Sequence, residues 1–442
     1  MLSTLKSAFG DKNIRKKIIF TLFVLAVFRL GAYITVPGVN AKALQEVASS
    51  GLVNVLNIFS GGGLTNYSIF AMGVSPYITA QIVVQLLQMD IVPKFVEWGK
   101  QGEVGRLKLD KVTRRLTIVL AFAQSIGITA GFNALSSLHL VENPGISTYA
   151  SIGLILTAGT MLTTWMGDMI TDKGIGQGVS MIIFAGIVAN IPTGLESIYR
   201  QYIQGTPTSD LWQPALFVVG LIIAMLVIVT FVTWVQQAER RIPIQYTRRA
   251  TGSSKNSYLP LKVNVAGVIP VIFASAFIST PQTILMFFTK NYGSQGWFKF
   301  MSELFNMQTP MGATFYTVLI VVFTFFYAFV QVNPEKLAEN LQKQGSYIPG
   351  VWPGKSTQLY VSRLLMRLST VGALFLGIVS LIPLIAQNLW DLNSSIGLGG
   401  TNLLIIVGVA IETMNQIKGL TMRQEYVGFI QNEPEDNDKG DK

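Results

Sequence analysis

Apolar runs of about twenty residues recur along the whole chain and alternate with short polar stretches. About twenty apolar residues in a helix cross the ~30 Å hydrocarbon core of a bilayer, so each run predicts one membrane span. We therefore expect an all-α polytopic membrane protein. The ten predicted spans are residues 18–36, 67–88, 116–135, 151–170, 179–199, 214–235, 265–288, 313–332, 365–387 and 402–417.

One apolar segment, residues 52–59, is too short to span. Its eight residues reach only about 12 Å as a helix. It lies between the first two spans and runs into Ser60-Gly61-Gly62-Gly63. Backbone of this kind at membrane depth must be enclosed by protein or line a water-filled cavity. The pattern predicts a re-entrant half-helix inside a hollow structure, and so a conduit rather than an anchor.

A short repeat divides the chain into two halves. Residues 73–80 and 267–274 both fit the pattern G-V-x-P-x-I-x-A, and each lies in the second span of a five-span half. Five is an odd number, so the halves enter the membrane in opposite directions, and inverted repeats place the functional path at their interface. A chance match in an apolar chain is the alternative. The predicted parts are tail 1–17, halves 18–199 and 200–417, and tail 418–442.

The basic residues predict the orientation. Of the 33 Lys and Arg residues, 28 lie in the two tails and in one set of alternating loops, and only four lie in the opposite loops. Positive charge accumulates in cytoplasmic loops, so both termini are expected in the cytoplasm. Two of the basic loops, residues 236–264 and 334–363, are too long for tight turns. Either they only set topology, or they form a docking platform for an anionic partner such as ribosomal RNA.

Few polar groups occur inside the predicted spans. Arg29 is the costliest and should face protein or water. Asp168 and Asp172 end the fourth span, and hydrogen bonding between helices is the ordinary role for such residues. The sequence offers no paired carboxylates, Ser/His arrangement or HExxH motif, and it contains no cysteine. We therefore expect no enzymatic activity, no cofactor and no metal site.

Several motifs together resemble the SecY family, the large subunit of the bacterial protein-conducting channel, over residues 14–426. They are NIFSGG at 57–62, GVSPYI at 73–78, GIGQG at 174–178, IFAG at 183–186, RRI at 240–242, LPLKVN at 259–264, GVIP at 267–270 and NP at 333–334. The resemblance implies a channel that translocates unfolded preproteins across the bacterial cytoplasmic membrane. It also implies lateral release of transmembrane segments into that membrane.

The resemblance assigns the short helix, within about 52–65, as a plug and a ring of aliphatic side chains as the pore constriction. The implied plug residues are Leu52, Val55, Leu56, Asn57, Ile58, Phe59, Ser60, Gly61 and Gly62. The implied ring residues are Val74, Ile78, Val179, Ile183, Ile269, Ile272 and Ile405. A narrow aliphatic ring hydrates poorly and resists the flow of ions. Simple helix packing is the alternative role for each of these residues.

The resemblance also implies a lateral gate between the second and third spans and the seventh, at Thr79, Gln85, Gln124 and Thr280. The implied partners are SecE-like and SecG-like small membrane subunits, the SecA motor, the ribosome, preproteins and membrane lipids. The implied motor or ribosome contacts are Arg240, Arg241, Arg248, Arg249, Trp352 and Lys355. Trp352 stands where the family usually has arginine, which weakens the expected cationic contact, because Lys355 replaces a bidentate arginine only in part.

A secondary transporter for a small solute is the main alternative, since it shares spans, inverted repeats and a broken helix. That class predicts polar broken helices converging at the midplane, whereas this chain has aliphatic residues there. An intramembrane enzyme is the third class, and it lacks candidate catalytic groups. Co-purification of a small SecE-like subunit distinguishes a channel from a transporter.

Overall fold

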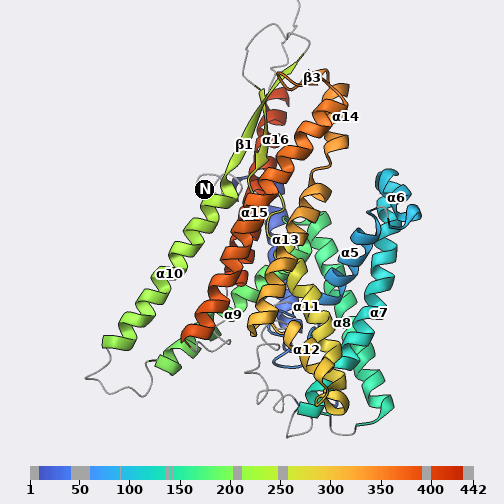
Figure 1. Cartoon of the computed structure of the whole chain (residues 1–442), viewed down its shortest axis with the longest axis vertical. Helices are drawn as coiled ribbons and strands as arrows, with labels where there is room; N and C mark the ends of the chain where they lie inside the picture. Colours follow the sequence, from blue (N-terminus) through green and yellow to red (C-terminus); the bar gives the residue numbers. More distant parts are fainter. Residues whose placement is uncertain are drawn as a thin grey trace, which may run out of the picture.

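The computed structural model describes residues 9–40, 60–89, 91–135, 140–141, 144–202, 212–246, 257–390 and 400–431. Helices run along the long axis of the molecule, with a small sheet at one end (Figure 1). We call that end the sheet side and the opposite end the far side. The helices at the ten predicted spans are α2 (Lys12–Gly31), α5 (Ser75–Leu87), α7 (Glu103–Leu135), α8 (Ile146–Lys173), α9 (Gly178–Tyr202), α10 (Trp212–Gln237), α11 (Ile269–Tyr292), α13 (Pro310–Gln331), α15 (Lys355–Trp390) and α16 (Gly400–Gln431).

Eight helical segments among the described residues are long and apolar enough to cross a membrane. They comprise every helix above except α2 and α5. Helix α2 begins with four basic residues, and its start is capped by Asp11, which accepts the backbone N–H groups of Asn13 and Ile14. Three shorter helices lie between the spans: α6 (Pro93–Lys100), α12 (Gly296–Leu304) and α14 (Pro334–Lys343).

The second predicted span is wrong in its first half. Residues 61–74 form turns, and α5 begins only at Ser75. Pro76 is the second helical residue and has no N–H, so it favours a helix start at this position, where no intrahelical bond from that N–H is needed. Gly73 precedes it with a φ of 53°, a left-handed conformation that costs glycine little. The 13 residues of α5 reach only about 20 Å.

The sequence repeat marks the same local structure at the start of α5 and of α11. Gly267 also has a positive φ, of 64°, and α11 begins at Ile269 with Pro270 as its second residue. Helix α5 leads to α6 towards the sheet side, whereas α11 leads from the sheet to α12 on the far side (Figure 1). The two repeated motifs therefore start helices that run in opposite directions and pack against each other.

The two long basic loops form one small sheet. Strand β1 (Glu239–Tyr246) pairs antiparallel with β2 (Ser257–Lys262), and Arg240 lies opposite Leu261. Strand β3 (Ser346–Tyr347), from the second loop, pairs antiparallel with the end of β1, giving the order β2-β1-β3. Ile242 and Leu261 pack with Leu341, Val361 and Leu365, so the sheet is attached to α14 and α15.

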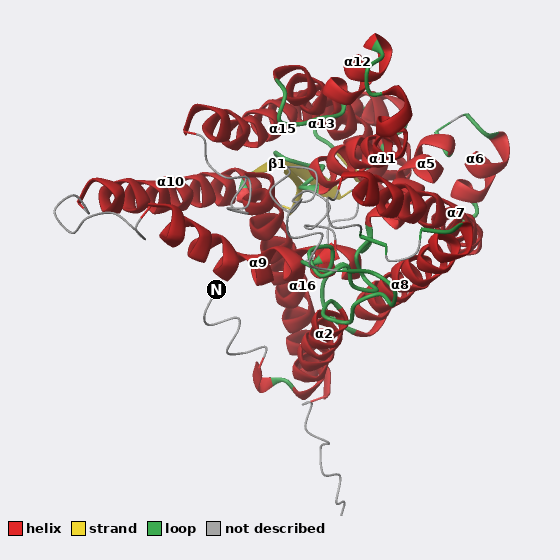
Figure 2. Cartoon of the chain, turned by 90° about the horizontal axis from the view of Figure 1, so that it is seen from below, coloured by secondary structure: helices red, strands yellow, loops and turns green. Residues whose placement is uncertain are grey.

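Several helices extend beyond the predicted spans. Helix α7 begins at Glu103 instead of 116, α15 at Lys355 instead of 365, and α16 continues to Gln431 instead of ending at 417. The added turns contain many polar residues, so hydropathy did not count them as parts of the spans, although residues such as Leu, Lys, Arg and Gln among them favour helix. Helix α10 stands at the edge of the molecule with most of its side chains exposed (Figure 2).

Candidate functional site

The seven predicted ring residues lie in one central hydrophobic cluster, contributed by α9, α11, α16 and the start of α5. Val74, Ile78, Ile183, Ile272 and Ile405 are buried, and Val179 and Ile269 are partly buried against the cluster. The same cluster includes Val232 of α10, Phe323 of α13 and Leu376 of α15. Its contacts therefore bring the ring residues together.

A cavity of about 300 Å³ adjoins this cluster at Ile269. Its lining is largely polar and includes Lys262 at the end of β2, so it lies towards the sheet side. Gln236 Nε2 and Asn264 Oδ1 are buried and make no hydrogen bond to the described residues. Unpaired buried polar atoms are costly, so water or a polar ligand in this cavity is the natural partner for them.

Three of the four predicted gate residues form one hydrogen-bonded group. Thr79 Oγ1 of α5 and Thr280 Oγ1 of α11 are 3.0 Å apart. Gln124 Nε2 of α7 donates to the same Thr280 oxygen at 2.8 Å. A few polar bonds in an otherwise apolar contact therefore join α11 to α5 and α7. We call this group the threonine–glutamine seam, and it is defined by Thr79, Gln124 and Thr280.

Two glycines that sequence reasoning missed belong to the same helix contact. A Cβ atom on Gly131 of α7 would lie 2.7 Å from Cβ of Met286 on α11, and one on Gly127 would lie 3.4 Å from the Thr283 carbonyl oxygen. Gly127 and Gly131 form a G-x-x-x-G pattern, which allows close approach of membrane helices. Gly127, Gly131 and Gln124 occupy one face of α7. The G-x-x-x-G spacing in the sequence could therefore have indicated this helix contact.

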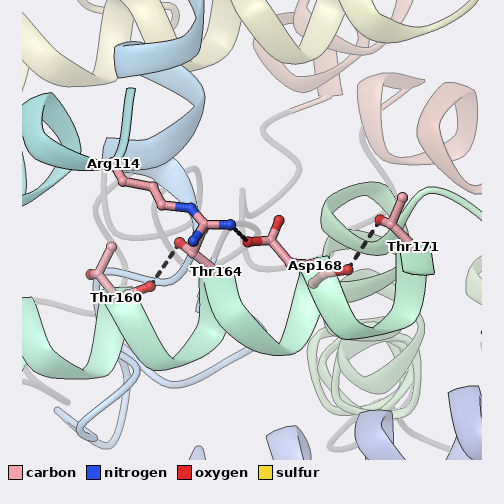
Figure 3. A network of polar contacts seen from close by, with 6 residues as sticks. Arg114, Thr160, Thr164, Asp168 and Thr171 are labelled. Atoms are coloured by element: carbon pink, nitrogen blue, oxygen red, sulfur yellow. Dashed lines mark hydrogen bonds and ion pairs between the residues drawn. The ribbon is translucent and has the colours of Figure 1, made fainter. Parts of the chain in front are cut away.

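The fourth predicted gate residue, Gln85, is not part of the seam. It lies near the end of α5, and its Oε1 atom is buried without a hydrogen bond to the described residues. A separate contact joins α7 to α8, where Arg114 Nη2 donates to Asp168 Oδ2 at 2.8 Å (Figure 3). The interhelical role considered for Asp168 is confirmed, and its partner lies in the part of α7 that precedes the predicted span.

The predicted plug falls largely outside the described residues: Leu52, Val55, Leu56, Asn57, Ile58 and Phe59 are not described. Its last residues, Ser60, Gly61 and Gly62, are buried. Arg29 Nη1 of α2 donates to the Gly61 carbonyl oxygen. A Cβ atom on Gly61 would lie 2.7 Å from the Phe28 ring. Arg29 therefore links the turn that starts at Ser60 to α2.

The predicted partner-contact residues lie on the sheet side. Arg240 and Arg241 are exposed on β1, where Arg241 Nε donates to Glu239 Oε1 at 2.7 Å and its guanidinium lies 4.9 Å from the centre of the Tyr258 ring. Trp352 is 82% exposed, and Lys355 begins α15. Arg248 and Arg249 lie outside the described residues. Pairing of β1 with β3 brings the two loops into one basic surface.

The site offers hydrogen bonds and apolar contacts but little reactive chemistry. No group of three or more His, Cys, Asp or Glu residues that could hold a metal occurs among the described residues. The arrangement combines an aliphatic cluster, a polar cavity on one side of it and a helix seam held by few polar bonds. Two side-chain hydrogen bonds of the seam break when α11 separates from α5 and α7.

Three comparisons relate the chain to known proteins. The family model described as SecY matches residues 68–414. The protein translocase subunit SecY 1 of Lactobacillus kefiranofaciens subsp. kefiranofaciens is 65% identical over 430 residues, which are 97% of this chain and 100% of that protein.

Solved structures share the fold. One described as the structure of a protein conducting channel has a TM-score of 0.65 at 17% identity, covering 96% of each chain. Sec61 in the canine ribosome-channel complex from the endoplasmic reticulum has a TM-score of 0.62 at 16% identity, covering 95% of each chain. At these identities the likeness concerns the fold alone.

Proposed function

Because the chain belongs to the SecY family and is a multi-pass membrane protein of a protein-translocation channel, we propose that its aliphatic cluster forms the pore constriction. The ring consists of Val74, Ile78, Val179, Ile183, Ile269, Ile272 and Ile405. The supporting observation is that these residues meet in one cluster beside a polar cavity. A passing polypeptide enters from the cavity and displaces aliphatic side chains that have no fixed hydrogen bonds to break.

The seal at rest combines the ring with the plug. Aliphatic constrictions resist wetting, so a narrow ring limits the passage of water and ions. The buried turn at Ser60, Gly61 and Gly62 carries the end of the plug segment, and its bond to Arg29 supports a fixed resting position. Opening then requires the turn to leave Arg29.

The lateral gate lies along the threonine–glutamine seam. Signal sequences and nascent membrane helices leave through it when α11 parts from α5 and α7. Only two hydrogen bonds of the seam cross this boundary, which supports a reversible opening. We propose that Gln85, near the end of α5, also borders this gate, away from the seam.

The basic loops that form the sheet support a proposal for the orientation and the partners. We infer that the chain resides in the bacterial cytoplasmic membrane with the sheet and both termini in the cytoplasm, as the basic loops indicate. The basic surface then binds the ribosome or the SecA motor, which supplies the energy for transport, and the chain itself is not an enzyme. The exposed α10 provides apolar surface for lipids or for SecE-like and SecG-like subunits. Arg248 and Arg249 remain proposed contacts from the sequence, and the exposed Trp352 gives the second loop an apolar contact where the family usually has arginine.

ATP-driven import of a preprotein into vesicles tests this function. The vesicles should contain the chain with a SecE-like and a SecG-like subunit, and SecA is added outside. A channel transports an unfolded preprotein of any length, whereas a secondary transporter transports a small solute down an ion gradient. Solute uptake without preprotein import would favour the transporter.

Charge reversal on β1 should weaken partner binding. In Arg240→Glu/Arg241→Glu we expect the affinity for SecA or ribosomes at low salt to fall about tenfold, equivalent to about 1.4 kcal/mol. The loss should shrink at high salt, because salt screens exposed charges. Membrane insertion should be unchanged, since many other basic residues maintain the topology.

Lys94→Glu/Lys100→Glu on α6 is the matched control, with the same change in net charge away from the sheet. A lower affinity of the Arg240→Glu/Arg241→Glu variant than of this control, measured by pull-down or interferometry, supports a specific contact on β1. If both variants bound the partner as tightly as the unchanged chain at low salt, Arg240 and Arg241 would serve only to set the topology.

Removal of the Arg29 side chain should loosen the turn after the plug. Leu64, in that turn, is fully buried, so Leu64→Cys should react slowly with a small water-soluble thiol reagent. Addition of Arg29→Met should raise the labelling rate about tenfold, the equivalent of losing roughly 1.4 kcal/mol from a charge-assisted hydrogen bond. Arg29→Lys should have a smaller effect. Equal labelling in all three backgrounds would show that Arg29 does not hold the turn.

A further inference from the structure

Helix α12 connects two membrane helices at their far-side ends. It follows α11 after residues 293–295 and precedes α13 after residues 305–309. Its nine residues span about 13 Å. Figure 2 shows α12 at the periphery of the molecule, outside α11 and α13. Because both neighbours cross the membrane, the short links keep α12 close to one membrane face.

The exposed surface of α12 is divided into two stripes. Trp297, Phe300 and Met301 follow helical spacing and are 55%, 49% and 37% exposed. Lys299, Ser302 and Glu303 are also exposed and occupy a second, polar face. Phe298 points between the stripes into the protein and is 4% exposed. The apolar stripe therefore faces away from the protein core.

The apolar stripe continues onto the end of α11. The rings of Phe288 and Tyr292 are 6.1 Å apart, and those of Tyr292 and Trp297 are 6.0 Å apart. Phe288 and Tyr292 are about 40% exposed, like the residues of α12. Helix α11 is long and apolar enough to cross a membrane over Ile269–Met286, and Phe288 and Tyr292 follow directly after that segment. The exposed apolar surface thus continues from the end of the span onto α12.

We propose that α12 is an interfacial helix whose apolar stripe, Trp297, Phe300 and Met301, inserts into lipid at the far-side boundary between headgroups and acyl chains. Aromatic residues, tryptophan above all, prefer this depth. An amphipathic helix lies there with its apolar face buried and its charges in water, as the face of Lys299 and Glu303 requires. The insertion holds the end of α11, the helix that carries Thr280, at a fixed depth. This inference depends only on the two flanking spans and stands whether or not the seam is a gate.

The natural absence of cysteine permits a direct test. Nitroxide labels are attached to Phe300→Cys and, as the matched control on the polar face, to Ser302→Cys, with the full chain in lipid vesicles. Oxygen concentrates in lipid, and a nickel chelate stays in water. The ratio of oxygen to nickel collision rates should be about fivefold higher at 300 than at 302, because an interfacial apolar face lies ~5–10 Å inside the headgroup boundary.

Three results would overturn the proposal. Equal ratios at 300 and 302 would mean that the stripe is in water. Protection of 300 from both reagents would mean that another protein surface, such as a second subunit, covers it. A higher ratio at 302 would reverse the orientation of the helix. Labels at Met301→Cys and Lys299→Cys should repeat the pattern of 300 and 302 respectively, which guards against a local distortion at either site.

Discussion

A disulfide between Thr79→Cys and Thr280→Cys should stop protein translocation, and its reduction should restore it. The two hydroxyl oxygens are 3.0 Å apart, so sulfur atoms in their places need only a small further approach to bond. The bond requires Cα atoms within roughly 7 Å, so it forms only when α5 and α11 are together. Translocation through a gate between these helices requires them to separate.

The measurement is ATP-driven import of a preprotein into vesicles, before and after oxidation and again after reduction. The chain contains no other cysteine, so no competing disulfide arises within it. Each single variant treated with the same oxidant is the control. A long, flexible cross-linker at the same two positions should allow transport, because it lets the helices part. Full transport through a completely oxidised pair would place the gate elsewhere.

Eight of the ten predicted spans were predictable from sequence, because an apolar run as long as the bilayer is thick is a local pattern. The repeat at 73 and 267 was expected within the second span of each half, and the structure begins α5 and α11 there. Thr79 and Thr280 are 201 residues apart in sequence, and the resemblance to the SecY family, together with the inverted repeat, was needed to expect them at one helix boundary.

Other features depended on tertiary contacts that no local pattern reports. Hydropathy counted residues 67–74 as helix because they are apolar, but the structure buries them as turns against other helices. The pairing of β1 with β3 joins loops about a hundred residues apart through two residues of β3. The bond from Arg29 to Gly61 joins α2 to a loop, so sequence indicated only that Arg29 needed a partner.

Two asparagines in the aliphatic ring should make the resting channel leak. In Ile78→Asn/Ile183→Asn, amide groups replace buried aliphatic side chains of the cluster that adjoins the polar cavity at Ile269. If this region is a constriction between aqueous spaces, water enters and hydrates the amides, so we expect ion conductance of resting vesicles to rise about tenfold or more. Preproteins with defective signal sequences should also pass more easily.

A dry helix core would respond differently, because burying an amide without partners costs about 2–7 kcal/mol and would lower the amount of folded protein. Ile320→Asn/Leu376→Asn is the matched control: both residues are fully buried in the same cluster, on α13 and α15, but neither is a ring residue. We expect this control to lose stability without a specific leak, as shown by melting and conductance measurements on the same preparation. If instead the ring variant lost stability as the control does and remained tight to ions, the cluster would be packing and the pore would lie elsewhere.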